Sequence, residues 1–144
     1  MSDEFIEEYN QFLTGEISAV ETYDLALQAV KRDDVRQVLN ACRNSHLTRV
    51  NKLRDHITKL GGKPATTAGI WGPFAAFSQQ GAGSEAEAVA LLEESEAERL
   101  VQYEADQNIV VSPVLEVLKE DLLRPQHETH LSVSSLLNTL QPTG

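Results

Sequence analysis

Apolar residues recur every three or four positions along four stretches of the chain, the spacing of a helix face that turns toward a core. The stretches cover approximately residues 2–31, 33–60, 84–107 and 112–140. None of them shows the two-residue alternation that is typical of a half-buried strand. The pattern therefore predicts an all-α protein built from four long helices.

Local signals mark the ends of these helices. Gly61 and Gly62, with a proline soon after, are typical of a helix C-terminus. Ser84 is followed three residues later by Glu87, which is the pattern of a capping box. Ser112 and Pro113 suit the N-cap and the first turn of the last helix. These signals agree with the boundaries that the apolar spacing predicts.

The connections predict the topology. The first two helices are joined by about two residues and the last two by about four, so each pair should form an antiparallel hairpin. Residues 61–83 are a much longer connection, and they contain Trp71, Phe74 and Phe77. We expect this crossover to pack along the bundle, so that the second and third helices run parallel. The prediction is one four-helix-bundle domain over residues 1–144, with two antiparallel hairpins joined by one long crossover.

One ionisable residue interrupts the apolar stripe of each helix: Glu16, His46, Glu96 and His130. Leaving such groups buried without partners would cost on the order of several kcal/mol each. We therefore expect the four side chains to lie at one level of the bundle, where they meet each other, a metal ion or water. The two hairpins look like copies, in which Glu16 is aligned with Glu96 and His46 with His130.

Tyr23 lies two helical turns beyond Glu16, and Tyr103 lies two turns beyond Glu96. The two tyrosines are therefore as far apart in residue number as the two glutamates. Two interpretations remain open for them. Their hydroxyls can donate hydrogen bonds to carboxylates that hold a metal. Alternatively, they are core aromatic residues whose hydroxyls find other partners.

Two Glu and two His residues that face inward from four helices are the way carboxylate-bridged two-metal sites are built in bundle cores. These ligands suit iron, manganese or zinc. The stretches "FLTGEISAVETYDLAL", "HLTRVNKLRDHITKLGGKP", "GIWGPF" and "LLRPQHETHL" resemble the ferritin-like superfamily. More narrowly, the chain is similar to an uncharacterised bacterial family of ferritin-like bundles, a domain of unknown function. The resemblance implies a metal site in the core.

The chain departs from the ferritin-like pattern at Arg43 and His127, which stand where those proteins carry the Glu of a Glu-x-x-His pair. Arginine cannot bind a metal. One hypothesis is an atypical metal site that uses five side chains: Glu16, His46, Glu96, His127 and His130. The alternative is a metal-free polar core in which Arg43 is the counter-ion of the glutamates. The first describes a metal-binding protein and the second an interaction or structural bundle, and neither decides whether the protein is an enzyme.

Composition narrows the partners and the location. The 144 residues carry a net charge of −10, which disfavours nucleic acids and anionic membranes as partners. No apolar run reaches the ~18 residues of a membrane span, and the N-terminus lacks the regions of a signal peptide. Cys42 is the only cysteine, so no intrachain disulfide is expected. We expect a cytoplasmic protein, and the sequence leaves open whether it forms a homo-oligomer.

Overall fold

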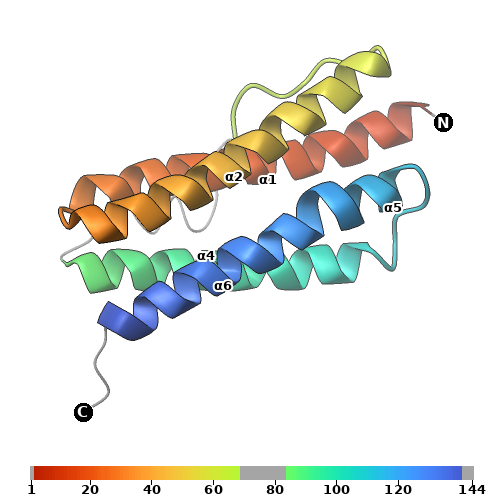
Figure 1. Cartoon of the computed structure of the whole chain (residues 1–144). Helices are drawn as coiled ribbons and strands as arrows, with labels where there is room; N and C mark the ends of the chain where they lie inside the picture. Colours follow the sequence, from red (N-terminus) through yellow and green to blue (C-terminus); the bar gives the residue numbers. More distant parts are fainter. Residues whose placement is uncertain (1, 69–83, 141–144) are drawn as a thin grey trace.

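The computed structural model describes residues 2–68 and 84–140 of the chain. Helix α1 spans Ser2–Ala29, α2 spans Asp33–Lys59 and α4 spans Glu85–Asp106 (Figure 1). The fourth helix consists of α5 (Val114–Val117), the π-helical segment η1 (Leu118–Leu123) and α6 (Arg124–Leu140). The described residues contain no strand, so the predicted all-α bundle is confirmed.

The helices form two pairs that lie one above the other (Figure 1). Residues 30–32 connect α1 to α2, and residues 107–113 connect α4 to α5. The two helices of each pair lie side by side and run in opposite directions. The three aromatic residues of the predicted crossover, Trp71, Phe74 and Phe77, lie outside the described residues.

Two helix ends have the geometry that the sequence predicts. The N–H of Gly62 bonds to the carbonyl of Ile57 at 2.9 Å, and Gly61 has a φ of 79°, which closes α2 with a left-handed cap. At the start of α4, the Ser84 hydroxyl accepts from the N–H of Glu87 at 3.1 Å. The fourth helix begins at Val114, slightly later than the sequence signals suggest.

The fourth helix has an irregular turn just before Pro125. Proline has no N–H, so the bond that an α-helix would make from position 125 to the carbonyl of Asp121 is missing. The segment Leu118–Leu123 is π-helical, and a π-turn is wider than an α-turn. In this region the buried side chains are four residues apart, at Leu118, Leu122 and Gln126.

The core consists of two apolar clusters with polar residues between them. One cluster includes Phe12, Leu53 and Tyr103, and the other includes Tyr23 and Leu39. On α2, α4 and the fourth helix, the buried polar residues lie between the parts that supply these clusters, and on α1 Glu16 lies near the same boundary. We call six of them the polar layer: Glu16, His46, Arg49, Glu96, Gln126 and Thr129.

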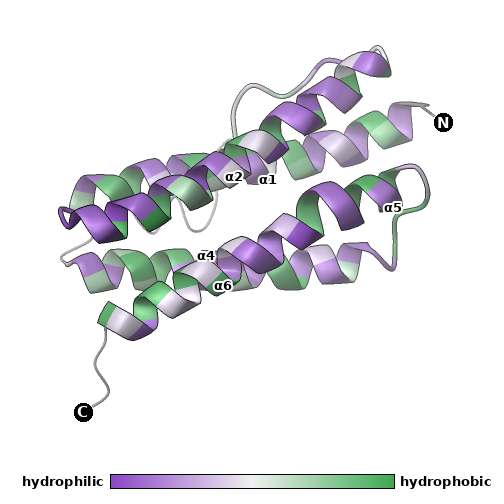
Figure 2. Ribbon diagram, in the orientation of Figure 1, coloured by the Kyte–Doolittle hydropathy of each residue, from purple (hydrophilic) through white to green (hydrophobic). Residues whose placement is uncertain are grey.

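Each helix carries both hydrophilic and hydrophobic residues along its length, as expected for helices that bury one face (Figure 2). Among the described helices, none is both long enough and apolar enough to cross a membrane.

Candidate functional site

The imidazole of His46 lies between two carboxylates in the polar layer. Its Nδ1 is 2.5 Å from Oε1 of Glu16, and its Nε2 is 2.6 Å from Oε2 of Glu96. All three side chains are at most 3% exposed. An ionised carboxylate can only accept hydrogen bonds, so both ring nitrogens must carry a proton. The structure therefore brings together Glu16, His46 and Glu96, and with both carboxylates ionised this geometry requires His46 to be an imidazolium ion.

The electrostatics of the layer favour the charged forms of these residues. Burial lowers the pKa of His46, but Glu16 and Glu96 outweigh burial, and the pKa is raised above its usual value. Burial raises the pKa of Glu16, but the positive charges of Arg49 and His46 lower it by more, so the net shift is downward. The pKa of Glu96 is also lowered against the effect of burial, chiefly by His46.

Arg49 supplies the second positive charge of the layer. Its Nη1 lies 3.5 Å from Oε2 of Glu16 and donates to Oε1 of Gln126 at 2.5 Å. Its Nη2 donates to the hydroxyls of Ser45 at 3.0 Å and Thr129 at 3.1 Å. The side chain is only 1% exposed. With His46 protonated, the six residues of the polar layer thus contain two carboxylates, one imidazolium and one guanidinium, and their charges sum to zero.

Gln126 and Thr129 complete the surroundings of Glu96. The Gln126 amide donates to Oε1 of Glu96 at 2.8 Å and to its backbone carbonyl at 2.9 Å. The Thr129 hydroxyl donates to the same Oε1 at 2.6 Å. Charge-assisted hydrogen bonds of this kind are about twice as strong as neutral ones. The carboxylate of Glu96 is therefore held in place from α6 as well as from α2.

Two tyrosines donate into the layer from opposite sides. Tyr23 of α1 donates to Oε2 of Glu96 on α4 at 2.7 Å, and Tyr103 of α4 donates to Oε2 of Glu16 on α1. Each tyrosine belongs to one hairpin and serves the glutamate of the other. Burial, reinforced by the nearby carboxylate, raises the pKa of both hydroxyls, so both stay protonated donors. Both tyrosines are therefore buried core aromatics whose hydroxyls donate to carboxylates, and a metal held by those carboxylates stays a prediction.

Equivalent positions in the two hairpins differ by the same residue number throughout. We call this difference, which separates Glu16 from Glu96, the hairpin offset. His46 and Arg49 of α2 contact Glu16 of their own hairpin. Gln126 and Thr129 of α6 contact the matching glutamate of theirs. The structural counterpart of His46 is therefore Gln126. The sequence aligned His46 with His130, which lies about one helical turn beyond Gln126.

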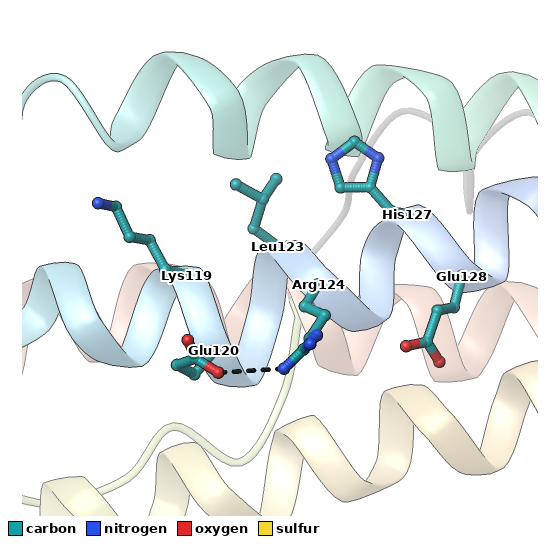
Figure 3. Close-up of a pocket in the computed structure, with 6 residues that line it drawn as sticks. All are labelled: Lys119, Glu120, Leu123, Arg124, His127 and Glu128. Carbon is teal, nitrogen blue, oxygen red and sulfur yellow. Dashed lines mark hydrogen bonds and ion pairs between the residues drawn. The ribbon is translucent and has the colours of Figure 1, made fainter.

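His130 and His127 lie outside the polar layer, so the structure does not place His130 on the buried face with Glu16, His46 and Glu96, as the sequence predicted. His130 is half-buried, with its Nε2 3.1 Å from Oε1 of Glu93. From Gln126 onward, α6 turns positions 129 and 133 inward, so the side chain at 130 falls beside the core. His127 is exposed and lies along a surface hollow (Figure 3). The hollow is lined by Lys119, Glu120, Leu123, Arg124, His127 and Glu128.

Arg43 is not the counter-ion of the buried glutamates. Its Nε lies 2.5 Å from Oδ1 of Asp24, and the two side chains are 29% and 49% exposed. Arg49 takes the predicted role, fewer than two turns further along α2. The signal that would have found it is the hairpin offset, which pairs Arg49 with Thr129 on the last helix.

The donor set of the layer does not fit a two-metal centre. Such centres take one Glu from each of two helices and a Glu-x-x-His pair from each of the others. Here the corresponding pairs are His46-x-x-Arg49 and Gln126-x-x-Thr129, so three of the six positions lack an ordinary ligand, and one of these three is a cation. Both nitrogens of His46 are engaged by carboxylates. In the described part of the chain, no group of three or more His, Cys, Asp or Glu residues is arranged to hold a metal ion.

Comparison with known proteins gives no relative, since no protein-family model, curated protein or solved structure matches this chain. The geometry of the polar layer is therefore the basis for the function proposed below.

Proposed function

We propose that this chain is a metal-free bundle of ferritin-like topology, with two antiparallel hairpins joined by the crossover of residues 61–83. In this proposal it acts as an interaction or structural protein and not through metal chemistry. The observation that carries the proposal is the position of Arg49. Its guanidinium, together with the imidazolium of His46, gives the carboxylates the positive charge that metal ions would supply in a ferritin-like core.

The layer suits a role in fixing the arrangement of the helices. Buried ion pairs stabilise a fold little compared with apolar side chains of the same volume, but their hydrogen bonds are lost if the helices shift. Every helix contributes to this layer, and each tyrosine ties one hairpin to the other. A bundle held in one register by such contacts presents its outer surfaces in a fixed arrangement, which is what a structural or interaction protein requires.

The competing function is metal binding, with iron, manganese or zinc in the core. The convergence of Glu16, His46 and Glu96 favours it, because all three are ordinary ligand types and each carboxylate lies within hydrogen-bond distance of the His46 ring. Binding would require His46 to lose at least one proton and one carboxylate partner, and Arg49 would place a like charge beside the metal.

Metal analysis of the purified protein separates the two functions. Protein from cells grown with added iron, manganese and zinc is measured for bound metal, and its melting temperature is recorded with and without a chelator. We expect far less than one metal per chain and a melting temperature that neither chelator nor added metal changes. Near-stoichiometric metal that a chelator removes would overturn the proposal if Glu16→Gln abolishes the binding. The control variant Glu93→Gln, which lies outside the layer, would in that case still bind the metal.

A further inference from the structure

The carboxylate of Glu85 joins the start of the second hairpin to the turn of the first. Its Oε2 accepts hydrogen bonds from the backbone N–H groups of Lys31 at 2.7 Å and of Arg32 at 2.8 Å. Glu85 is the first residue of α4, and the two N–H groups belong to the connection between α1 and α2 (Figure 1). Hydrogen bonds to an ionised oxygen are about twice as strong as neutral ones. The contact therefore ties the two hairpins together at this end of the bundle.

The turn between α1 and α2 is held in shape by residues of its own hairpin. Nη1 of Arg36 on α2 donates to the carbonyls of Leu27 at 2.6 Å and of Val30 at 2.9 Å. The side chain of Arg32 is paired with Asp34, through Nε at 3.1 Å and Nη2 at 2.7 Å. None of these contacts involves the second hairpin. The first hairpin thus shapes the turn by itself, and its two N–H groups are in position before the carboxylate of α4 reaches them.

The contact lies well away from the polar layer, which ties the hairpins at the middle of the bundle. Roughly three turns of α4, or about 16 Å, separate Glu85 from Glu96. The apolar cluster in this half of the bundle includes Val35 and Val89, but hydrophobic contact is not directional and does not set an angle. Two bodies that are tied at one level can pivot about that level, whereas a second tie at a distance fixes the angle between them.

We propose that Glu85 is a latch between the hairpins, which seats in a turn that the first hairpin has already shaped and fixes the angle between the two pairs of helices. Glu85 is partly exposed, and Lys31 and Arg32 are exposed, so the latch can be released without disturbing buried residues. This end of the bundle then opens by a pivot about the polar layer, whose own contacts are kept. The latch does not depend on the proposed absence of metal, because none of its atoms belongs to the polar layer.

The first test measures the contact itself. Solvent exchange of the backbone N–H groups of Lys31 and Arg32 is followed by NMR, relative to the N–H of Arg36, which bonds to the carbonyl of Arg32 at 3.0 Å. We expect Glu85→Ala to speed the exchange several-fold relative to Arg36, and Glu85→Gln, which keeps an acceptor without the charge, to speed it less. Glu87→Ala is the control, because it removes another carboxylate from the first turn of α4 and should leave the ratio unchanged. An unchanged ratio in Glu85→Ala would overturn the latch.

The second test measures the angle between the hairpins. The C-terminal ends of α1 and α6 lie at the latched end of the bundle (Figure 1). Nitroxide labels are attached there at two exposed positions through Gln28→Cys and Asn138→Cys, in a Cys42→Ala background, and double electron–electron resonance gives the distribution of distances between them. We expect Glu85→Ala to broaden this distribution toward longer distances, and Glu87→Ala to leave it unchanged. The same distribution with and without Glu85→Ala would overturn the claim that the latch fixes the angle.

Discussion

The guanidinium of Arg49 lies 3.5 Å from the carboxylate of Glu16, and both side chains are at most 1% exposed. Removing one partner of a buried ion pair leaves the other charge uncompensated, which typically costs about 3–5 kcal/mol. We expect Arg49→Met to lower the free energy of unfolding by about this amount at neutral pH, as measured by urea denaturation. At lower pH the loss should shrink, because Glu16 can then take up a proton.

Arg43→Met is the matched control for this change, because it removes an arginine from the same helix. Arg43 pairs with Asp24 at a partly exposed position, so its removal should change the free energy of unfolding by no more than about 0.5 kcal/mol. Equal losses in the two variants would contradict the assignment of Arg49 as the counter-ion.

The two tyrosine hydroxyls should each contribute to stability through the carboxylate of the opposite hairpin. Tyr23→Phe and Tyr103→Phe each remove one donor from a buried carboxylate, and each should lower the free energy of unfolding by about 1–3 kcal/mol. Tyr9→Phe is the control, since Tyr9 is a buried tyrosine of α1 that takes no part in the layer. A loss at Tyr9 as large as at the other two would argue against a specific role for the hydrogen bonds.

Several features of the layer follow from the sequence by simple reasoning. Glu16 and Glu96 lie inside apolar stripes, and a charged group in such a place needs a partner of opposite charge. The same spacing put His46 on the inner face of α2, and the structure places its ring between the two carboxylates. The matched positions of Tyr23 and Tyr103 also led to donors within reach of carboxylates.

The last helix could not be read correctly from spacing alone. Helix periodicity allows steps of three or four residues, so Gln126 can be followed on the inner face by Thr129 or by His130. The sequence analysis placed His130 on the inner face because histidine can bind metals. The helix instead turns Thr129 inward after the π-helical segment. A π-turn has no reliable signature in one sequence, and the proline that follows it indicates an irregularity without giving its form.

Arg49 was missed for a related reason. It is adjacent to the apolar residue Val50, and arginine is almost always found at the surface, so the stripe of α2 appeared to continue through Val50 alone. The structure buries both residues. A strict search for equivalents at the hairpin offset in all four helices would have matched Arg49 with Thr129.

The pH dependence of stability follows from the directions of the pKa shifts. The pKa of Glu16 is lowered in the folded protein, so its contribution is present above the unfolded value of 4.5 and is lost as the pH falls below it. The pKa of His46 is raised, so its contribution is present below the unfolded value of 6.5 and is lost as the pH rises toward the folded pKa. Unfolding at a series of pH values should show maximal stability between these values. The decline above the unfolded pKa of histidine should be weaker in His46→Gln, and a decline of the same size in this variant would contradict the role of His46.

Placing metal ligands at four of the six inner positions, beside Glu16 and Glu96, should create a metal site. The variant His46→Glu, Arg49→His, Gln126→Glu and Thr129→His carries the Glu-x-x-His pairs where the contacts place them. We expect it to bind Co²⁺ or Zn²⁺ with a large rise in melting temperature, because metal would offset the repulsion of four carboxylates.

The matched comparison for this redesign is Arg43→Glu with His127→Glu, which completes the pairs at the positions suggested by the sequence alone. That variant should bind no metal in the core, because His130 and position 127 lie outside the layer. Metal binding by this second variant and not by the first would contradict the pairing of His46 with Gln126 and of Arg49 with Thr129 as equivalent positions of the two hairpins.

We propose that His46 is an imidazolium ion held between two carboxylates, in a core that needs no metal. Side-chain ¹H–¹⁵N correlation NMR of His46 tests it most directly, since it reports the protonation of each ring nitrogen separately. At pH 7 we predict that both nitrogens carry protons and that added iron, manganese or zinc leaves their signals unchanged. A nitrogen without a proton, or signals that shift or disappear when one equivalent of metal is added, would contradict the claim.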